Sequence, residues 1–208
     1  MNKDKLDIFQ QIIDRSLWFG SEDLKNQGWC ITSNEIEDEL YRFVRKSGTS
    51  ELDAIEFLLT ERFDTLLLPE LERETSLLIS PYSDMLQESI RAFKLGFYNI
   101  CVPSLFSIIE AALMFLANRG EYKSIRYVSG IRNRANSEQF HYSLRSKLKD
   151  IANITEELFS KIQFDQKECD TQLNRHASVH GRRETPYTKA DCLKLFLLLS
   201  SIKSCFSN

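Results

Sequence analysis

The chain has 208 residues, of which 42% are hydrophobic and 27% are charged, with only 7 Gly and 4 Pro. This composition is typical of a globular protein and excludes a disordered or fibrous chain. A many-stranded β-sandwich needs a turn about every 8–12 residues, so this low content of glycine and proline disfavours an all-β fold.

The net charge of −3 is divided unevenly along the chain. Residues 1–80 hold 9 Lys and Arg against 17 Asp and Glu, a net charge of −8, whereas residues 81–208 hold 18 against 13, a net charge of +5. Such an asymmetry indicates a polyanionic partner or two halves that face each other. Two solvated surfaces of opposite sign would give the same arithmetic.

The first 79 residues follow a helical period in short, acidic segments. Apolar residues three and four apart predict a helix over residues 6–17. Ser33 and Gly48 are the start and stop signals of a second helix. Ser50, with Asp53 three residues later, resembles a capping box and begins a third helix. We expect these helices to form an accessory layer.

From Ser80 onward the apolar stripes become longer. Ser80 and Pro81 predict the start of a helix, because Pro is tolerated in the first turn. Pro103 opens a second, strongly apolar helix, which Asn118 and Gly120 end. Because the connection between these two helices is short, we expect them to form an antiparallel pair.

Three further helices are predicted in the second half. One begins at Glu138 or Tyr142 and runs towards Ile162, a mostly polar helix follows over residues 166–180, and an apolar closing helix covers residues 188–202, with a good N-cap threonine at its start. No strand pattern longer than four residues competes with this interpretation.

The sequence therefore predicts an all-α fold in two parts, an acidic helical extension over residues 1–79 and a helical domain over residues 80–208. The opening residues lack the apolar core of a signal peptide, and the 5 Cys form no Cys-x-x-Cys pair, so we expect a cytoplasmic protein. The apolar stretch over residues 100–117 contains Pro103 and Glu110 and is better interpreted as a core helix than as a membrane span. No membrane partner is expected.

The densest polar cluster in the chain is Asn-Arg-His-Ala-Ser-Val-His-Gly-Arg-Arg, at residues 174–183. His176 and His180 are four residues apart and would share one face of a helix, which Gly181 would end. The partial negative charge of a helix C-terminus favours protonated His and Arg. A solvated helix end with no function is the alternative interpretation.

The run Asn-Arg-His-x-x-x-His-Gly at residues 174–181 resembles the signature of HEPN-domain proteins, in particular the bacterial NRHxxxHG subset. The stretches over residues 92–98 and 108–110 are similar to the two helices that precede the motif in that family, and the apolar run over residues 193–199 is similar to the helix that follows it. The resemblance covers about residues 80–206 and leaves the acidic extension unexplained.

This resemblance implies a HEPN-like antiparallel bundle that forms a homodimer and acts as a metal-independent endoribonuclease, without a cofactor. His180 would deprotonate the RNA 2′-OH or protonate the leaving oxygen, and Arg175 would stabilise the charge on the phosphate. His176 or Asn174 would orient the phosphate or share the acid–base work. The product would carry a 2′,3′-cyclic phosphate.

Other relatives of this kind are inactive, so a non-catalytic nucleotide- or protein-binding module is the alternative, and a structural helical protein with a chance motif is a third possibility. A toxin–antitoxin or antiviral defence setting is compatible with the resemblance, with an antitoxin or regulatory protein as a partner. The acidic extension could itself be such a regulator, if it covers a basic cleft by charge complementarity.

A basic and aromatic stretch precedes the motif. Residues 119–149 hold 8 Lys and Arg against two acidic residues, with aromatic residues between them. Basic side chains neutralise phosphates and aromatic rings stack on unpaired bases, although a solvated face with partly buried tyrosines would give the same pattern. The candidate RNA-binding residues are Arg132, Arg134, Tyr127, Arg182 and Arg183.

Two further features have more than one interpretation. Arg134 and His141 have the same kind of arginine-to-histidine spacing, but they lie in a region without the surrounding motif. We interpret this second match as a chance occurrence, with a contribution of His141 to binding as the alternative. Glu110 is either a satisfied core carboxylate or a partner of Arg175 or His180.

A zinc site is the remaining alternative. His176 and His180 could be two ligands, with Cys169 or Asp170 nearby. The adjacent arginines would repel a cation, however, and there is no His-Glu-x-x-His sequence. The sequence therefore predicts no metal.

Overall fold

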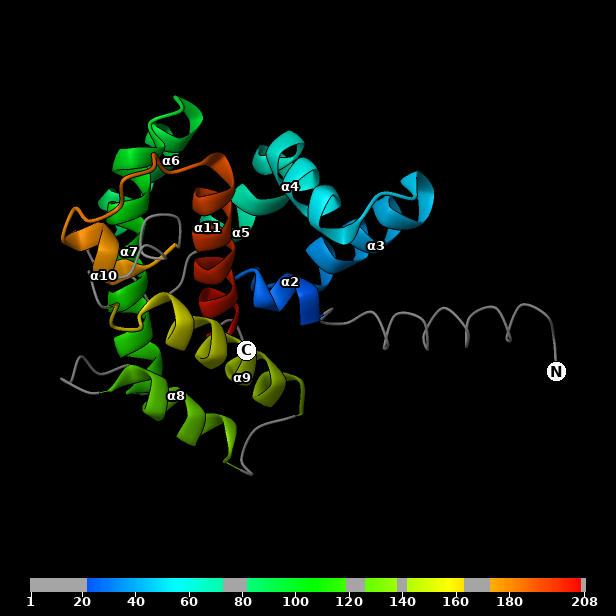
Figure 1. The fold of residues 1–208 in the computed structure, drawn as a ribbon. Coiled ribbons are helices and arrows are strands. Elements are labelled where there is room, and N and C mark those ends of the chain that lie inside the picture. Colours follow the sequence, from blue (N-terminus) through cyan, green and yellow to red (C-terminus); the bar gives the residue numbers. More distant parts are fainter. Residues whose placement is uncertain (1–21, 73–81, 119–125, 138–141, 163–172, 207–208) are drawn as a thin grey trace, which may run out of the picture.

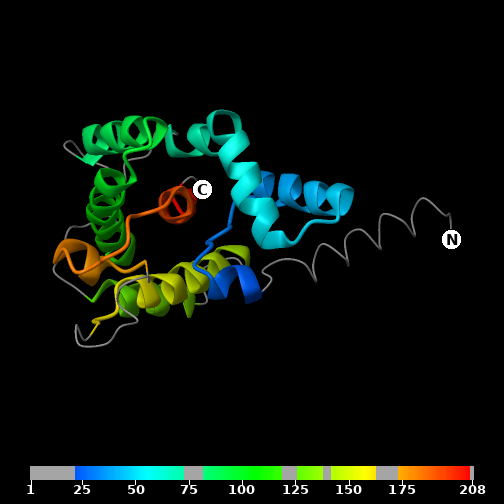
Figure 2. The ribbon, with the colours of Figure 1, turned by 45° about the horizontal axis from the view of Figure 1, so that its top comes forward.

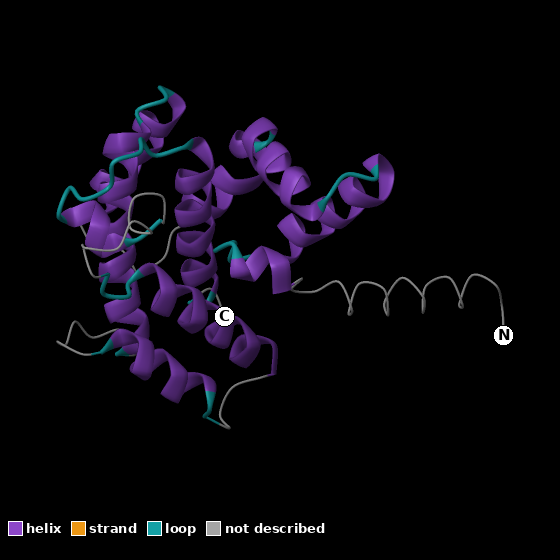
Figure 3. Cartoon of the chain, viewed as in Figure 1, coloured by secondary structure: helices purple, strands orange, loops and turns teal. Residues whose placement is uncertain are grey.

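The computed structural model describes residues 22–72, 82–118, 126–137, 142–162 and 173–206. Within these ranges every regular element is a helix, as Figure 3 shows, which confirms the predicted all-α fold. The helix predicted over residues 6–17 lies outside the described residues.

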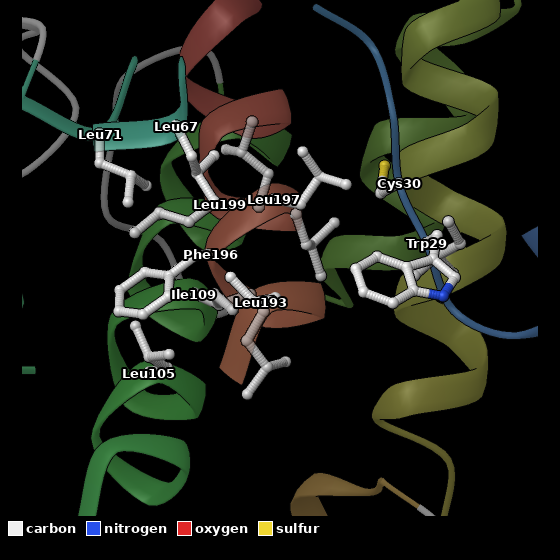
Figure 4. Packing of buried hydrophobic residues seen from close by; sticks show 14 of the residues in the cluster. Trp29, Cys30, Leu67, Leu71, Leu105, Ile109, Leu193, Phe196, Leu197 and Leu199 are labelled. Carbon is white, nitrogen blue, oxygen red and sulfur yellow. The ribbon is translucent and has the colours of Figure 1, made fainter. Parts of the chain in front are cut away.

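Helices α7 (Tyr98–Ala117) and α11 (Lys189–Ser204) pack against each other at the centre of the fold (Figure 1). α7 is an almost continuous apolar run, and α11 begins with a capping box between Thr188 and Asp191, as the N-cap prediction requires. Their facing side chains form the middle of the core shown in Figure 4. They include Leu105, Ile109, Leu193 and Phe196.

Helix α6 (Tyr82–Lys94) turns directly into α7 through Gly96. Gly96 has φ +80°, and the N–H of Phe97 donates to the carbonyl of Ala92 at 2.8 Å, which is the hydrogen-bond pattern of a Schellman turn. The short connection is thus as predicted. The predicted start of the second helix at Pro103 is wrong, because this glycine turn lets the helix begin at Tyr98 and leaves Pro103 inside it.

Helices α8 (Tyr127–Ala135), α9 (Tyr142–Leu158) and α10 (Arg175–Val179) complete the second half. α8 packs on both α9 and α7. A Cβ on Gly130 would lie only 2.9 Å from the Cβ of Ala117, so the close approach of α8 to α7 depends on a glycine there. The polar helix predicted over residues 166–180 is represented by the five residues of α10, since residues 163–172 lie outside the described part.

The described part of the N-terminal half contains α2 (Glu22–Asn26), α3 (Asn34–Ser47), α4 (Glu51–Glu61), the π-helical turn η1 (Phe63–Leu67) and α5 (Leu68–Glu72). The predicted signals are confirmed: Ser33 and Gly48 bound α3, and the Ser50 hydroxyl accepts the N–H of Asp53 at 3.2 Å. Trp29, Cys30, Leu67 and Leu71 join the same hydrophobic core as α7 and α11 (Figure 4). The two predicted parts of the chain therefore share one core.

Helices α2 to α5 lie on the other side of α11 from α10 in both orientations of the ribbon (Figures 1 and 2). Charge complementarity between the two halves suggests the acidic extension as a cover for a basic cleft. Its described helices do not reach α10, so they do not cover the motif.

Helix α7 is the one described helix that is long and apolar enough to cross a membrane, and 56% of its most apolar window is buried within the protein. The core helix of a soluble protein has the same length and composition. Because α7 packs against α6, α8, α10 and α11, its surroundings match the predicted core helix.

Candidate functional site

Helix α10 is held in place by Asn174, the residue that precedes it. The side-chain oxygen of Asn174 accepts hydrogen bonds from the N–H groups of His176 at 2.7 Å and Ala177 at 3.3 Å, which is an N-cap. Its amide nitrogen donates to the carbonyl of Ser160 at 3.1 Å and to the Ser160 hydroxyl at 3.2 Å. Since Asn174 is fully buried, it positions the motif and is not placed to contact a substrate.

Arg175 forms an ion pair with Glu110 of α7, with 2.7 Å between Nη2 and Oε2. The two side chains are 35% and 27% exposed. The structure therefore supports the interpretation of Glu110 as a partner of Arg175. A guanidinium has five N–H donors, so a pairing through one nitrogen leaves Arg175 able to bind a second anionic group.

Tyr127, the first residue of α8, lies beside this ion pair. Its ring packs edge-to-face on Phe159, with 5.6 Å between the ring centroids. Burial and, to a smaller extent, the Glu110 carboxylate raise the pKa of Tyr127 to about 12, although Arg175 opposes the shift. The phenol therefore keeps its proton at neutral pH. The structure thus brings Tyr127, one of the predicted RNA-binding residues, next to Arg175.

His176 and His180 stack edge-to-face on one side of α10, with 4.7 Å between their ring centroids. The Nδ1 atom of His176 accepts a hydrogen bond from the N–H of Ile162 at 3.3 Å, so the proton of the neutral ring is on Nε2. Burial lowers the pKa of His176 from its ordinary 6.5, and its charged neighbours, His180 first, lower it further. His176 is therefore held as a neutral donor, whereas His180 is exposed to solvent.

The end of α10 is the turn that the sequence predicts. Gly181 has φ +61°, and the N–H of Arg182 donates to the carbonyl of Ala177 at 3.0 Å. Arg182 is exposed. Arg182 and Arg183 are both predicted to bind RNA, but they differ in exposure, because the side chain of Arg183 turns inward.

The guanidinium of Arg183 is an internal anchor. Its Nη2 pairs with Oδ2 of Asp191 at 3.0 Å, its Nε donates to the carbonyl of Thr185 at 3.1 Å, and it stacks 4.3 Å from the ring centroid of Tyr187. The side chain is only 7% exposed. Arg183 therefore fastens the loop after α10 to the first turn of α11 and is not available to RNA.

The described part of the basic stretch also has structural contacts. Arg132 bridges from α8 to Glu156 of α9 at 2.5 Å. Arg134 donates to the carbonyl of Leu116 near the end of α7, and Arg145 donates to the carbonyl of Ala135 at 3.1 Å. These three contacts join α8 to α9, α8 to α7, and α9 to α8.

Neither the zinc alternative nor the second arginine–histidine match gains support. The described residues contain no group of three His, Cys, Asp or Glu side chains that could hold a metal ion. Cys169, Asp170 and His141 lie outside the described residues. In the described geometry, Nδ1 of His176 already accepts a backbone N–H.

Sequence reasoning missed Lys161, which follows the end of α9. Its positive charge acts on His176 and lowers the pKa of that ring, after the larger effects of burial and His180. No local pattern marks Lys161, because its position depends on contacts from Ser160 and Ile162 to residues 174–176.

Comparison with known proteins gives no match to a family model, to a curated protein or to a solved structure.

Proposed function

We propose that this chain is a metal-independent endoribonuclease of the HEPN type, which cleaves RNA through a 2′,3′-cyclic phosphate. The observation that carries the proposal is the grouping on α10, where Arg175, paired with Glu110 at 2.7 Å, adjoins the stacked rings of His176 and His180. Cleavage next to the RNA 2′-OH requires groups that move a proton and a cation that stabilises the phosphorane. Helix α10 offers both.

In this proposal His180 is the acid–base residue. Its imidazole removes the proton of the 2′-OH and the 2′-oxygen attacks the neighbouring phosphorus. The bond from phosphorus to the 5′-oxygen then breaks, and the 5′-oxygen takes the proton from the resulting imidazolium. His180 is the exposed ring of the pair, so it can exchange protons with solvent between turnovers. An imidazole serves both as base and as acid near neutral pH.

Arg175 and His176 would act on the phosphate without changing protonation state. Arg175 donates to the non-bridging oxygens while Glu110 fixes its orientation. His176, whose Nδ1 accepts the Ile162 N–H at 3.3 Å, presents Nε2–H as a donor. Asn174 stays buried beneath them and positions both.

The proposal extends to the assembly and location of the protein. A homodimer would bring two copies of α10 together in one basic cleft, on a HEPN-like bundle built from α6, α7, α9 and α11. A toxin or antiphage role, with an antitoxin or regulatory protein, belongs to the same proposal. The described cysteines, Cys30, Cys101, Cys192 and Cys205, are all free and buried, which suits a cytoplasmic location.

The test compares wild type with Arg175→Ala and His180→Ala on mixed RNA in EDTA. We expect wild type to leave cyclic-phosphate ends and both variants to lose cleavage. Arg45→Ala, an exposed arginine on α3 away from α10, is the matched control and should cleave normally. Undiminished cleavage by His180→Ala would overturn the mechanism, and loss only in Arg134→Ala and His141→Ala would show that the other pair is the site.

A non-catalytic protein-binding module is the second candidate, and one observation favours it. Leu95, Phe97 and Ile100, at the turn from α6 to α7, are each more than half exposed, and exposed apolar groups of this kind mark interaction surfaces. The two candidates differ in the EDTA assay, because a binding module leaves RNA intact in wild type.

A further inference from the structure

The segment that follows α9 is fixed to the α10 motif on both sides of one residue. Ser160 accepts two hydrogen bonds from the buried amide of Asn174, at 3.1 and 3.2 Å. The N–H of Ile162 donates to Nδ1 of His176 at 3.3 Å. Lys161 lies between these two anchored residues, so the motif itself sets the backbone position of Lys161.

The Lys161 side chain is exposed, and its charge acts on His176. It lowers the pKa of His176 more than Arg175 does, although less than burial and His180 do. Among the described residues Lys161 forms no ion pair. The nearest acidic residue before it in the chain, Glu157 of α9, acts on another lysine, because burial lowers the pKa of Lys194 of α11 and the charge of Glu157 opposes that shift.

Lys161 thus differs from several other cations of the second half. Arg132 is paired with Glu156, and Arg183 is paired with Asp191. Arg175 is partly neutralised by Glu110. The exposed ammonium of Lys161 adds a positive charge where an anionic ligand would approach His176.

We propose that Lys161 binds a second phosphate of the RNA backbone, next to the phosphate on which Arg175 and His180 act. The identity of the ligand as RNA rests on the proposed function. Lysine binds phosphate as a point charge and requires no fixed fork geometry, which suits an exposed side chain on a fixed backbone. The site then extends from α10 to the end of α9.

The experiment measures binding of the full chain to a 2′-O-methyl RNA oligonucleotide, which lacks the nucleophile and cannot be cleaved by this route. Fluorescence anisotropy over a series of salt concentrations gives the slope of log K against log salt. Loss of one phosphate contact on a single strand should reduce the magnitude of the slope by about 0.7. When the salt is raised from about 50 to about 200 mM, the fold-loss of affinity should therefore be about 2.6 times smaller for Lys161→Gln than for wild type. The charge-matched control Lys46→Gln, which replaces an exposed lysine of α3, should keep the wild-type slope, and Lys161→Arg should keep most of it.

The outcomes separate this inference from the proposed function. Equal slopes for wild type and Lys161→Gln, or no binding by wild type, overturn the assignment of Lys161. A reduced slope with no cleavage of ordinary RNA supports Lys161 and overturns the ribonuclease. Cleavage by wild type with an unchanged slope in Lys161→Gln keeps the ribonuclease and removes Lys161 from the site. Circular dichroism of each variant identifies any that fails to fold, and Lys161→Arg then decides.

Discussion

Two arginine–carboxylate pairs flank the α10 motif, and they differ in burial. Arg183 and Asp191 are 7% and 10% exposed, with 3.0 Å between their charged atoms. Arg175 and Glu110 are 35% and 27% exposed, at 2.7 Å. The Arg183–Asp191 pair is buried and fastens a loop to α11, whereas the Arg175–Glu110 pair is accessible enough to contact a ligand. The same two residue types therefore serve folding in one place and are available for chemistry in the other, and burial makes the difference.

The largest expected effect is loss of the enclosed pair. Arg183→Ala leaves Asp191 buried without its cation, and removing one partner of such a pair costs about 3–5 kcal/mol of unfolding free energy. Urea unfolding followed by circular dichroism measures this cost. The adjacent, exposed Arg182→Ala is the control and should change stability by less than about 0.5 kcal/mol. Similar costs for both variants would contradict the distinction by burial.

The exposed pair should show the opposite response. We expect Arg175→Ala to reduce cleavage by about 10²- to 10³-fold, the typical loss when one donor to a developing oxyanion is removed. Its unfolding free energy should fall by about 1 kcal/mol or less, since partly exposed ion pairs contribute little. Initial cleavage rates and urea unfolding of the same preparation check both statements. A folded Arg175→Ala protein with full activity would remove Arg175 from the mechanism.

The cap of α10 should have a smaller effect on stability. Asn174→Ala removes the N-cap acceptor and the bonds to Ser160, and we expect a loss of about 1–2 kcal/mol. Asn174→Asp keeps the acceptor and removes the amide donor, so it separates capping from attachment to α9. If Asn174→Asp is as stable as wild type, the bonds to Ser160 contribute nothing measurable.

Local signals were sufficient for most of the fold. Ser33, Gly48, Ser50 and Thr188 lie at helix ends as predicted, because caps depend on a few neighbouring residues. The start of α7 was missed because Pro103 also satisfies the pattern of a first turn. The positive φ of Gly96, which decides the boundary, depends on how α6 ends.

The candidate site was predicted only in its local part. The motif on α10 and the stop at Gly181 could be found from spacing. The inward turn of Arg183 and the position of Lys161 could not, since both depend on tertiary contacts. The pairing of Glu110 with Arg175 spans 65 residues, so the sequence could propose it only as one of two interpretations.

The smallest effect is a pH dependence that comes from His176. Its pKa in the folded protein lies below the ordinary 6.5, mainly through burial, so below about pH 6.5 the unfolded chain binds more protons at this residue than the folded chain does. Stability is then fully present above pH 6.5 and falls as the pH drops towards the lowered pKa. We expect His176→Gln, which cannot be protonated, to show a shallower loss of unfolding free energy between about pH 7 and about pH 5. Urea unfolding at several pH values gives both slopes, and parallel curves would show that His176 is not held in its neutral form by the fold.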